Sequence, residues 1–236
     1  MIVVTGATGN VGRAPLDRLL AAGRPVRALT RDPERASLPE EAEVVRFRPE
    51  DPAAQFAGAT SLFLYAQASS VPLLEAARAQ GVRQVVLLSS GIIHKGVDDT
   101  HPIHALHALH ALHALHAAAE RQIRDSGLAW TFLRPNAFAA NALQSAPQIR
   151  TGNTVRGVFA GARFAPIREG DIAAVAERAP GGTGHEGPRE ADELARDDRG
   201  SALVGEEGAG TCGAVAGCGS RRPWPAEAAR ARRPNA

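Results

Sequence analysis

Three glycines near the start of the chain have the spacing of a loop that binds phosphate. In the stretch VTGATGNVGR they are Gly6, Gly9 and Gly12. We expect Gly6 to permit a tight turn, Gly9 to let backbone N–H groups approach a pyrophosphate, and Gly12 to let the next helix pack close to the preceding strand. The positive end of that helix's dipole would then face the phosphates. The alternative is a glycine-rich turn that holds no ligand.

A second set of chemical groups follows the next apolar run, where the sequence reads ALTRDPER. Nucleotide-binding folds that prefer NAD usually place a carboxylate here, on the ribose 2′-OH. In this chain Thr30 and Arg31 come first, and Asp32 follows. A guanidinium suits a 2′-phosphate by its charge and its fork of donors. We therefore expect NADP(H) rather than NAD(H) as the cofactor. An Arg31–Asp32 surface pair with no cofactor role is the alternative.

Residues 104–116 form a His-Ala-Leu repeat with five histidines. Because an α-helix turns about 100° per residue, a step of three moves each histidine about 60° backwards around the helix. The histidines therefore spiral instead of sharing one face. No pair has the i,i+4 spacing of a helical zinc site, and no carboxylate lies within the repeat. We expect no metal site, and we interpret the repeat as expansion of a nine-base unit, tolerated because alanine and leucine favour helix.

Short apolar runs alternate with helical patterns around these groups. Strands are expected at residues 2–5, 26–29, 42–47, 61–66, 84–90 and 129–134, which are apolar on both faces. Helices are expected at residues 12–23, 70–81 and 104–126, and loops with a turn or two of helix at 33–40 and 52–58. This alternation predicts right-handed βαβ units and an α/β fold, a Rossmann-like doubly wound parallel sheet.

Composition narrows the functional classes. The formal net charge of +2 is too small to indicate a nucleic-acid partner. The sequence has no run of about 18 apolar residues, so no membrane span is expected, and no signal peptide is expected before the first strand. The two cysteines, Cys212 and Cys218, both lie near the C-terminus. A reducing, cytoplasmic location fits this usage best.

The texture of the sequence changes near residue 180. Residues 180–236 contain no Ile, Phe, Tyr or Met and are dominated by Gly, Ala, Arg and Pro. Such a stretch buries too little apolar surface to offset its chain entropy. We therefore divide the chain into an NAD(P)-binding Rossmann domain at residues 1–178 and a low-complexity, disordered tail at 179–236. A basic binding arm around RARRP is the alternative for the tail.

Five stretches, in order, resemble a known family. VTGATGNVGR, ALTRDPER, VVLLSSG, RQIRDSGLAWTFLRPNAFAAN and DIAAVAERA look like the atypical short-chain dehydrogenase/reductases. The most similar branch is the NmrA-like, NAD(P)H-binding one, which includes quinone- and azo-reductase-like members. The resemblance implies an oxidoreductase that passes hydride to a small quinone-like or azo-like acceptor. It equally allows a non-catalytic redox sensor that binds NADP and then a regulatory protein partner, or a damaged copy with little activity.

The resemblance also assigns residues by position. The cofactor-binding residues that it implies are Gly6, Thr8, Gly9, Asn10, Val11, Gly12, Arg31, Ala66, Gln67, Ser89 and Pro135. The substrate side that it implies comprises Asn136, Phe138, Asn141 and Asp171. Ser90 and His116 are the expected catalytic residues. His116 would hydrogen-bond the nicotinamide ribose or donate a proton; the alternative is a partly exposed helix histidine.

Several positions depart from the family pattern. Phe47 and Arg48 stand where Gly-Asp usually contacts adenine, and Gly91 stands near the place of the superfamily's catalytic serine. Tyr65 is the only tyrosine and Lys95 the only lysine, so a Tyr-x-x-x-Lys pair is absent. The family continues with further strands and helices after DIAAVA, so the substrate half of the fold is expected to be truncated.

Overall fold

The structure is a computed structural model of the whole chain. It describes residues 1–9, 11–93, 107–152, 155, 166–178 and 189–190. Asn10 of the predicted phosphate loop, the first three residues of the predicted helix 104–126, and both cysteines lie outside the described residues.

One parallel sheet organises the described part of the chain, with strands in the order β3-β2-β1-β4-β5-β6-β7. Its strands are β1 (Ile2–Thr5), β2 (Val26–Thr30), β3 (Glu43–Arg46), β4 (Ser61–Tyr65), β5 (Gln84–Leu88), β6 (Ala129–Leu133) and β7 (Arg189–Glu190). The six expected strands and the Rossmann-like α/β class are thereby confirmed. Because the strand order reverses between β1 and β4, a crevice forms at their carboxyl ends, where such folds bind ligands.

Five α-helices lie between or beyond the strands in the described residues. They are α1 (Arg13–Ala21), α2 (Val71–Ala79), α3 (His107–Asp125), α4 (Ala146–Thr151) and α5 (Glu169–Arg178). Short 3₁₀ turns are η1 (Ala53–Phe56), η2 (Ala66–Ala68) and η4 (Ala139–Ser145). The three expected helices are confirmed, and α2 begins where Ser70 accepts a hydrogen bond from the Leu73 N–H. None of the described helices combines the length and apolarity needed to cross a membrane.

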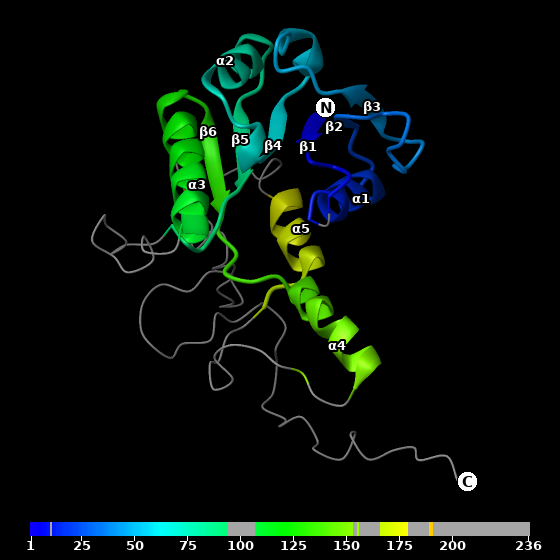
Figure 1. Cartoon of the computed structure of the whole chain (residues 1–236). Coiled ribbons are helices and arrows are strands. Elements are labelled where there is room, and N and C mark those ends of the chain that lie inside the picture. The colour runs from blue at the N-terminus through cyan, green and yellow to red at the C-terminus, as the bar shows by residue number, and fades with distance from the viewer. Residues whose placement is uncertain (10, 94–106, 153–154, 156–165, 179–188, 191–236) are drawn as a thin grey trace, which may run out of the picture.

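The helices cover both faces of the sheet. Helices α1 and α5 pack on one face, through Leu16 and Leu19 of α1 and Ile172 of α5. Helices α2 and α3 cover the other face, through side chains that include Leu74 and Ile123. Figure 1 shows this layering, with α4 extending away from the sheet. Burial on both faces explains why the central strands β1, β4 and β5 read as continuous apolar runs, whereas β3 is exposed or half-buried.

The expected tail at residues 179–236 falls almost wholly outside the described residues. Arg189 and Glu190 are the exception, because they form β7 and pair in parallel with Thr131 and Phe132 of β6. This short edge strand was not predicted from the residue pattern. The division into a domain and a disordered tail therefore stays a prediction.

Candidate cofactor site

A cavity of about 740 Å³ opens at the carboxyl ends of the central strands. It extends from Arg31 after β2, past the glycine loop after β1, to Phe138 after β6. Its lining residues are Thr5, Gly6, Thr8, Gly9, Val11, Gly12, Leu29, Thr30, Arg31, Phe47, Phe63, Tyr65, Gln67, Ala68, Leu88, Phe138, Ala140, Asn141 and Glu169. The fold thus brings segments from most of the domain to one hollow.

Backbone geometry explains the glycines of the loop. Gly6 has a φ of 65°, a left-handed conformation that favours glycine. The Gly9 N–H donates to the Gly6 carbonyl oxygen at 2.9 Å, which closes the turn. A Cβ on Gly12 would collide with that same oxygen and lie 2.7 Å from the Gly6 carbonyl carbon. Only glycine at position 12 therefore lets α1 start this close to β1, with the N-terminal end of the helix next to the cavity-lining loop.

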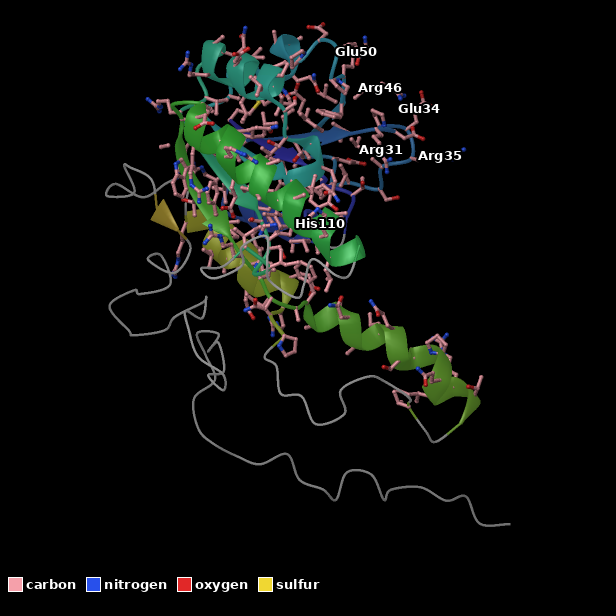
Figure 2. The ribbon with its side chains drawn as sticks, turned by 60° about the vertical axis from the view of Figure 1, so that its left-hand side comes forward. Arg31, Glu34, Arg35, Arg46, Glu50 and His110 are labelled. Carbon is pink, nitrogen blue, oxygen red and sulfur yellow. The ribbon has the colours of Figure 1, made fainter. Side chains whose placement is uncertain are left out.

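One arginine lies at the far end of the cavity. Arg31 lines the cavity, and its carbonyl oxygen accepts a hydrogen bond from Arg46 Nη1 at 2.7 Å. Figure 2 shows Arg31, Arg35 and Arg46 at one end of the molecule, together with Glu34 and Glu50. Asp32 pairs with Arg35 at 3.6 Å instead of with Arg31. Among the described residues Arg31 and Asp32 therefore form no ion pair, and Arg31 lines the hollow. Its contact with a cofactor stays a prediction.

Aromatic side chains in the cavity were not anticipated as site residues. Phe47, Phe63 and Tyr65 line it, and each lies at or near the carboxyl end of a strand. Phe47 also continues the sheet past β3, since its N–H donates to the Thr30 carbonyl oxygen at 2.8 Å. The aromatic rings offer stacking surface near Phe47 and Arg48, the positions where the family usually has the Gly-Asp pair that contacts adenine. Their place at strand ends was the sequence signal that could have found them.

Ser89 belongs to a buried polar cluster rather than to the cavity lining. Its hydroxyl donates to Glu120 Oε1 at 2.6 Å. Glu120 is fully buried on α3 and receives two hydrogen bonds from Arg134, at 2.9 and 2.7 Å, and one from Arg124 at 3.1 Å. The cluster ties α3 to the ends of β5 and β6, because a bidentate Arg–carboxylate pair fixes geometry as well as charge.

His116 lies one helical turn before Glu120 and is only 7% exposed. The expectation of a partly exposed helix histidine is therefore wrong. Within the described residues its Nδ1 has no hydrogen-bond partner. Burial lowers the pKa of the imidazole below its ordinary value, and the Glu120 carboxylate offsets part of that shift. The described residues that line the cavity do not include His116.

The predicted spiral of the repeat is visible in the exposure of successive histidines. His110 is exposed, His113 is half-buried and His116 is buried. The helix therefore turns its histidines progressively toward the core, as a three-residue step requires. Within the part of the chain that the structure describes, no group of three His, Cys, Asp or Glu side chains is placed to hold a metal ion.

Only some of the residues predicted for the substrate side line the cavity. Phe138 and Asn141 line it, whereas Pro135 and Asn136 lie between them and the end of β6. Asp171 lies in the first turn of α5 and forms an ion pair with Arg168 at 3.8 Å.

Three further predicted site residues lie after β4 and β5, and one cavity residue that was not predicted begins α5. Ala66 is buried in η2, while its neighbour Gln67 lines the cavity. The Ser90 hydroxyl oxygen accepts from the Ile92 N–H at 3.3 Å. Glu169, which the sequence did not single out, lines the cavity with one oxygen buried and unpartnered among the described residues.

Comparisons with known proteins agree with this geometry. A family described as NAD(P)H-binding matches residues 6–179. A (4-alkanoyl-5-oxo-2,5-dihydrofuran-3-yl)methyl phosphate reductase of Streptomyces griseus is 39% identical over 195 residues, covering 79% of this chain and 65% of that protein. An NAD(P)H azoreductase of Xenophilus azovorans is 30% identical over 206 residues, with coverage of 79% and 65%. The chain thus spans about two thirds of the length of these relatives.

A solved structure shows the same architecture. The NADPH-dependent quinone oxidoreductase of Escherichia coli superposes with a TM-score of 0.65 at 25% identity, covering 86% of this chain and 76% of that one. Its complex with NADPH superposes with a TM-score of 0.60 at 26% identity. The glycine loop, the strand order and the matched residues lead to one conclusion. The chain belongs to the NAD(P)H-binding family of atypical short-chain dehydrogenase/reductases.

Proposed function

We propose that the protein is an NADPH-dependent reductase that passes hydride to a quinone-like or azo-like acceptor. One observation carries the proposal: a single cavity extends from Arg31, past the glycine loop, to Phe138. Its volume of about 740 Å³ lies within the usual range of ligand pockets, roughly 300–1,000 Å³.

The residues present fit a dinucleotide. The backbone of the glycine loop, at the N-terminal end of α1, would hold the pyrophosphate, and Arg31 would hold the adenosine 2′-phosphate. Phe47 and Tyr65 would flank the adenosine half, while Phe138 and Asn141 would border the reacting half. When bound, NADPH supplies the hydride, which is the difficult part of the chemistry. The chain's own contribution is to orient the two reactants and exclude water.

The relatives support both halves of the proposal. The Streptomyces griseus and Xenophilus azovorans proteins are named as a reductase and an NAD(P)H azoreductase. The Escherichia coli structures are named for a quinone oxidoreductase and for its NADPH complex. The names of these relatives cover different acceptors, and those of the azoreductase and the quinone oxidoreductase include a reduced nicotinamide cofactor.

Proton delivery remains part of the proposal. Ser90 is the proposed hydroxyl at the reacting end, because it directly follows β5 and Ser89. His116 is proposed to act through Glu120, which lies one turn further along α3 and accepts the Ser89 hydroxyl proton in a hydrogen bond. The neutral imidazole that burial favours suits a positioning role better than that of an acid.

A non-catalytic NADP sensor is the second candidate. Neither Ser89 nor His116 is among the described residues that line the cavity, so the cofactor can be held without contact to either. Consumption of NADPH separates the two functions, because a sensor binds the cofactor and leaves it unchanged.

The first experiment is a calorimetric titration of the protein with NADPH and with NADH. The Arg31→Ala variant should lose about tenfold or more in NADPH affinity and little in NADH affinity, because only NADPH carries the 2′-phosphate. Arg83→Ala, an exposed arginine before the amino end of β5, is the matched control and should bind both as the wild type does. Absence of binding to either nucleotide would contradict both functions. Turnover is then followed at 340 nm with a quinone and an azo dye.

A further inference from the structure

A carboxylate lies at the end of the cavity opposite to Arg31. Glu169 is the first residue of α5 and lines the cavity. Backbone hydrogen bonds fix its place. The Ile167 N–H donates to the Ala137 carbonyl oxygen at 2.8 Å, and the Ile167 carbonyl oxygen accepts from the Ala139 N–H at 2.8 Å. This bridge sets Ile167 beside Phe138. Glu169, two residues further along the chain, therefore lies at the Phe138 end of the cavity.

The described lining of the cavity carries one charge of each sign. Arg31 is its only cationic side chain and Glu169 its only anionic one. They stand at opposite ends, because Arg31 follows β2 and Glu169 lies beside the segment that follows β6. Most of the lining near that segment is apolar and includes Leu88, Phe138 and Ala140. The carboxylate is therefore the feature that distinguishes this end of the cavity.

The described residues leave one oxygen of this carboxylate without a partner. Glu169 Oε1 is buried and accepts no hydrogen bond from any of them. The neighbouring cation is turned elsewhere, since the Arg168 side chain is 76% exposed and pairs with Asp171 at 3.8 Å. A carboxylate oxygen taken out of water without a partner is costly. A positive group that enters the cavity would therefore gain a counter-ion that the fold already holds in place.

We propose that Glu169 binds a positively charged group of the acceptor, so that the enzyme prefers cationic acceptors to neutral and anionic ones. This inference rests on the proposed reductase function and adds the charge of the acceptor to it. NADPH does not supply the cation, because its phosphates are anionic and its reduced nicotinamide is uncharged. Arg31 and Glu169 thus separate the two reactants by charge, with the phosphates at one end and the acceptor at the other.

The pairing acts on binding and not on the chemical step. The carboxylate contacts a charged substituent of the acceptor, which is not the atom that receives the hydride. The contact is therefore the same in the ground state and in the transition state. Its loss should raise KM and leave kcat nearly unchanged. The loss of a proton donor would instead lower kcat.

Three azobenzenes that differ in one substituent test the proposal. 4-(Trimethylammonio)azobenzene is cationic, 4-tert-butylazobenzene is its uncharged isostere, and azobenzene-4-sulfonate is anionic. Glu169→Gln removes the charge at nearly constant size, and Glu169→Lys reverses it. Glu177→Gln is the matched control, because Glu177 lies about 12 Å further along the same helix and pairs with Arg18.

For each variant we would measure kcat and KM with the three dyes. Calorimetry would give the Kd of each dye in the presence of NADP⁺ and the Kd of NADPH and of NADP⁺ alone. The midpoint of urea unfolding would show that each variant is folded. Comparing each variant with the wild type on the same dye removes the differences in reactivity among the dyes.

Glu169→Gln should raise the KM and the Kd of the cationic dye by at least about tenfold, the lower end of what a close charge pair contributes across an interface. The values for the tert-butyl dye should change by less than about threefold, because an uncharged group gains nothing from the carboxylate. Glu169→Lys should make the sulfonate the most tightly bound of the three dyes. Glu177→Gln should match the wild type with all of them.

The outcomes separate this inference from the function on which it rests. Wild-type protein that binds NADPH and the dyes but reduces none of them would overturn the reductase function. The dye Kd values would still test Glu169 in that case. Turnover in which Glu169→Gln keeps the wild-type KM and Kd for the cationic dye would overturn the inference alone.

Two further results would also refute it. An equal loss with all three dyes, together with weaker NADP⁺ binding, would place the carboxylate on the oxidised nicotinamide instead of the acceptor. An equal effect of Glu177→Gln would show that the preference comes from the overall field of the protein and not from the charge at the cavity.

Discussion

Glu120 is a buried carboxylate whose charge is balanced within the fold. Its oxygens accept hydrogen bonds from Ser89, Arg124 and Arg134, and the Arg134 side chain is itself only 14% exposed. Taking such charges out of water is costly, so the cluster holds only while every member is present. A single substitution here leaves the remaining partners buried without compensation.

Glu120→Ala should therefore destabilise the protein by about 3–5 kcal/mol, the range for removing one partner of a buried ion pair. Glu177→Ala is the matched control, because Glu177 pairs with the half-exposed Arg18 at the surface. That change should cost about 0–1 kcal/mol. Urea unfolding followed by circular dichroism measures both. Equal losses in the two variants would show that the Glu120 cluster is no stronger than a surface pair.

Helix α3 changes character along its length. His110 and Leu112, inside the repeat, are exposed, whereas His116 at its end is buried. Glu120 and Ile123, which follow the repeat, are buried as well. The second half of α3 packs in the apolar core through Ala119 and Ile123, and the repeat forms the first turns of the helix. An imidazole at the boundary is buried beside a carboxylate that already has its partners.

The buried imidazole gives α3 a pH-dependent contribution to stability. The pKa of His116 is lower in the folded chain than the ordinary value of about 6.5, so below that pH the unfolded chain binds a proton that the native one does not. Stability is then lost as the pH falls from about 6.5 through the folded-state pKa. His116→Gln should flatten this part of the curve, whereas His110→Gln, exposed on the same helix, should leave it unchanged. Urea unfolding between pH 7.5 and 5 measures the difference. A wild-type curve that the His116 variant reproduces would refute the assignment.

The predictable elements are those whose own residues determine them. The strands were found because they read as short apolar runs, and α2 because residues 70–81 have a helical pattern that ends at a glycine, Gly81. Helices α4 and α5 and strand β7 were not predicted, because they are short or depend on packing against distant segments. Site residues that only the packing of distant segments brings together were likewise not predicted.

The place of the glycine loop and Arg31 at the cavity was predictable, since it follows from residue type and strand position. The Ser89–Glu120–Arg134 cluster was not, because Glu120 is 31 residues from Ser89 and 14 from Arg134, and only the sheet brings the three together. The place of Glu169 beside Phe138 is of the same kind: 31 positions separate the two residues, and the bridge between Phe138 and Ile167 joins their segments.

At the scale of the whole molecule, α1 and α5 together cover one face of the sheet. Ile172, Ala173 and Ala176 of α5 are buried, and the first and last of these pack in the cluster that contains Leu16 and Leu19 of α1. The Arg18–Glu177 pair joins the later turns of both helices, so their N-termini lie at the same end, beside the cavity. A stable domain therefore needs the chain at least as far as α5.

Shortened chains test this boundary. A chain ending at residue 190 keeps every buried side chain of both apolar clusters, and its thermal midpoint should stay within about 4 °C of the full chain. A chain ending at residue 168 loses α5 and should be less stable by at least about 3 kcal/mol, because Leu16 and Leu19 lose their cover. Differential scanning calorimetry measures both. Similar midpoints for the two chains would refute the role given to α5.

The spiral of α3 also bears on how the gene can vary. Each His-Ala-Leu unit adds about 4.5 Å to the N-terminal part of α3. The added residues precede His116, whereas the buried Glu120 and Ile123 follow it. Slippage during replication that inserts or deletes a nine-base unit would leave the buried half of the helix in register. Isolates of the same lineage should therefore differ here in whole units of three residues, with natural selection acting weakly on the number of copies.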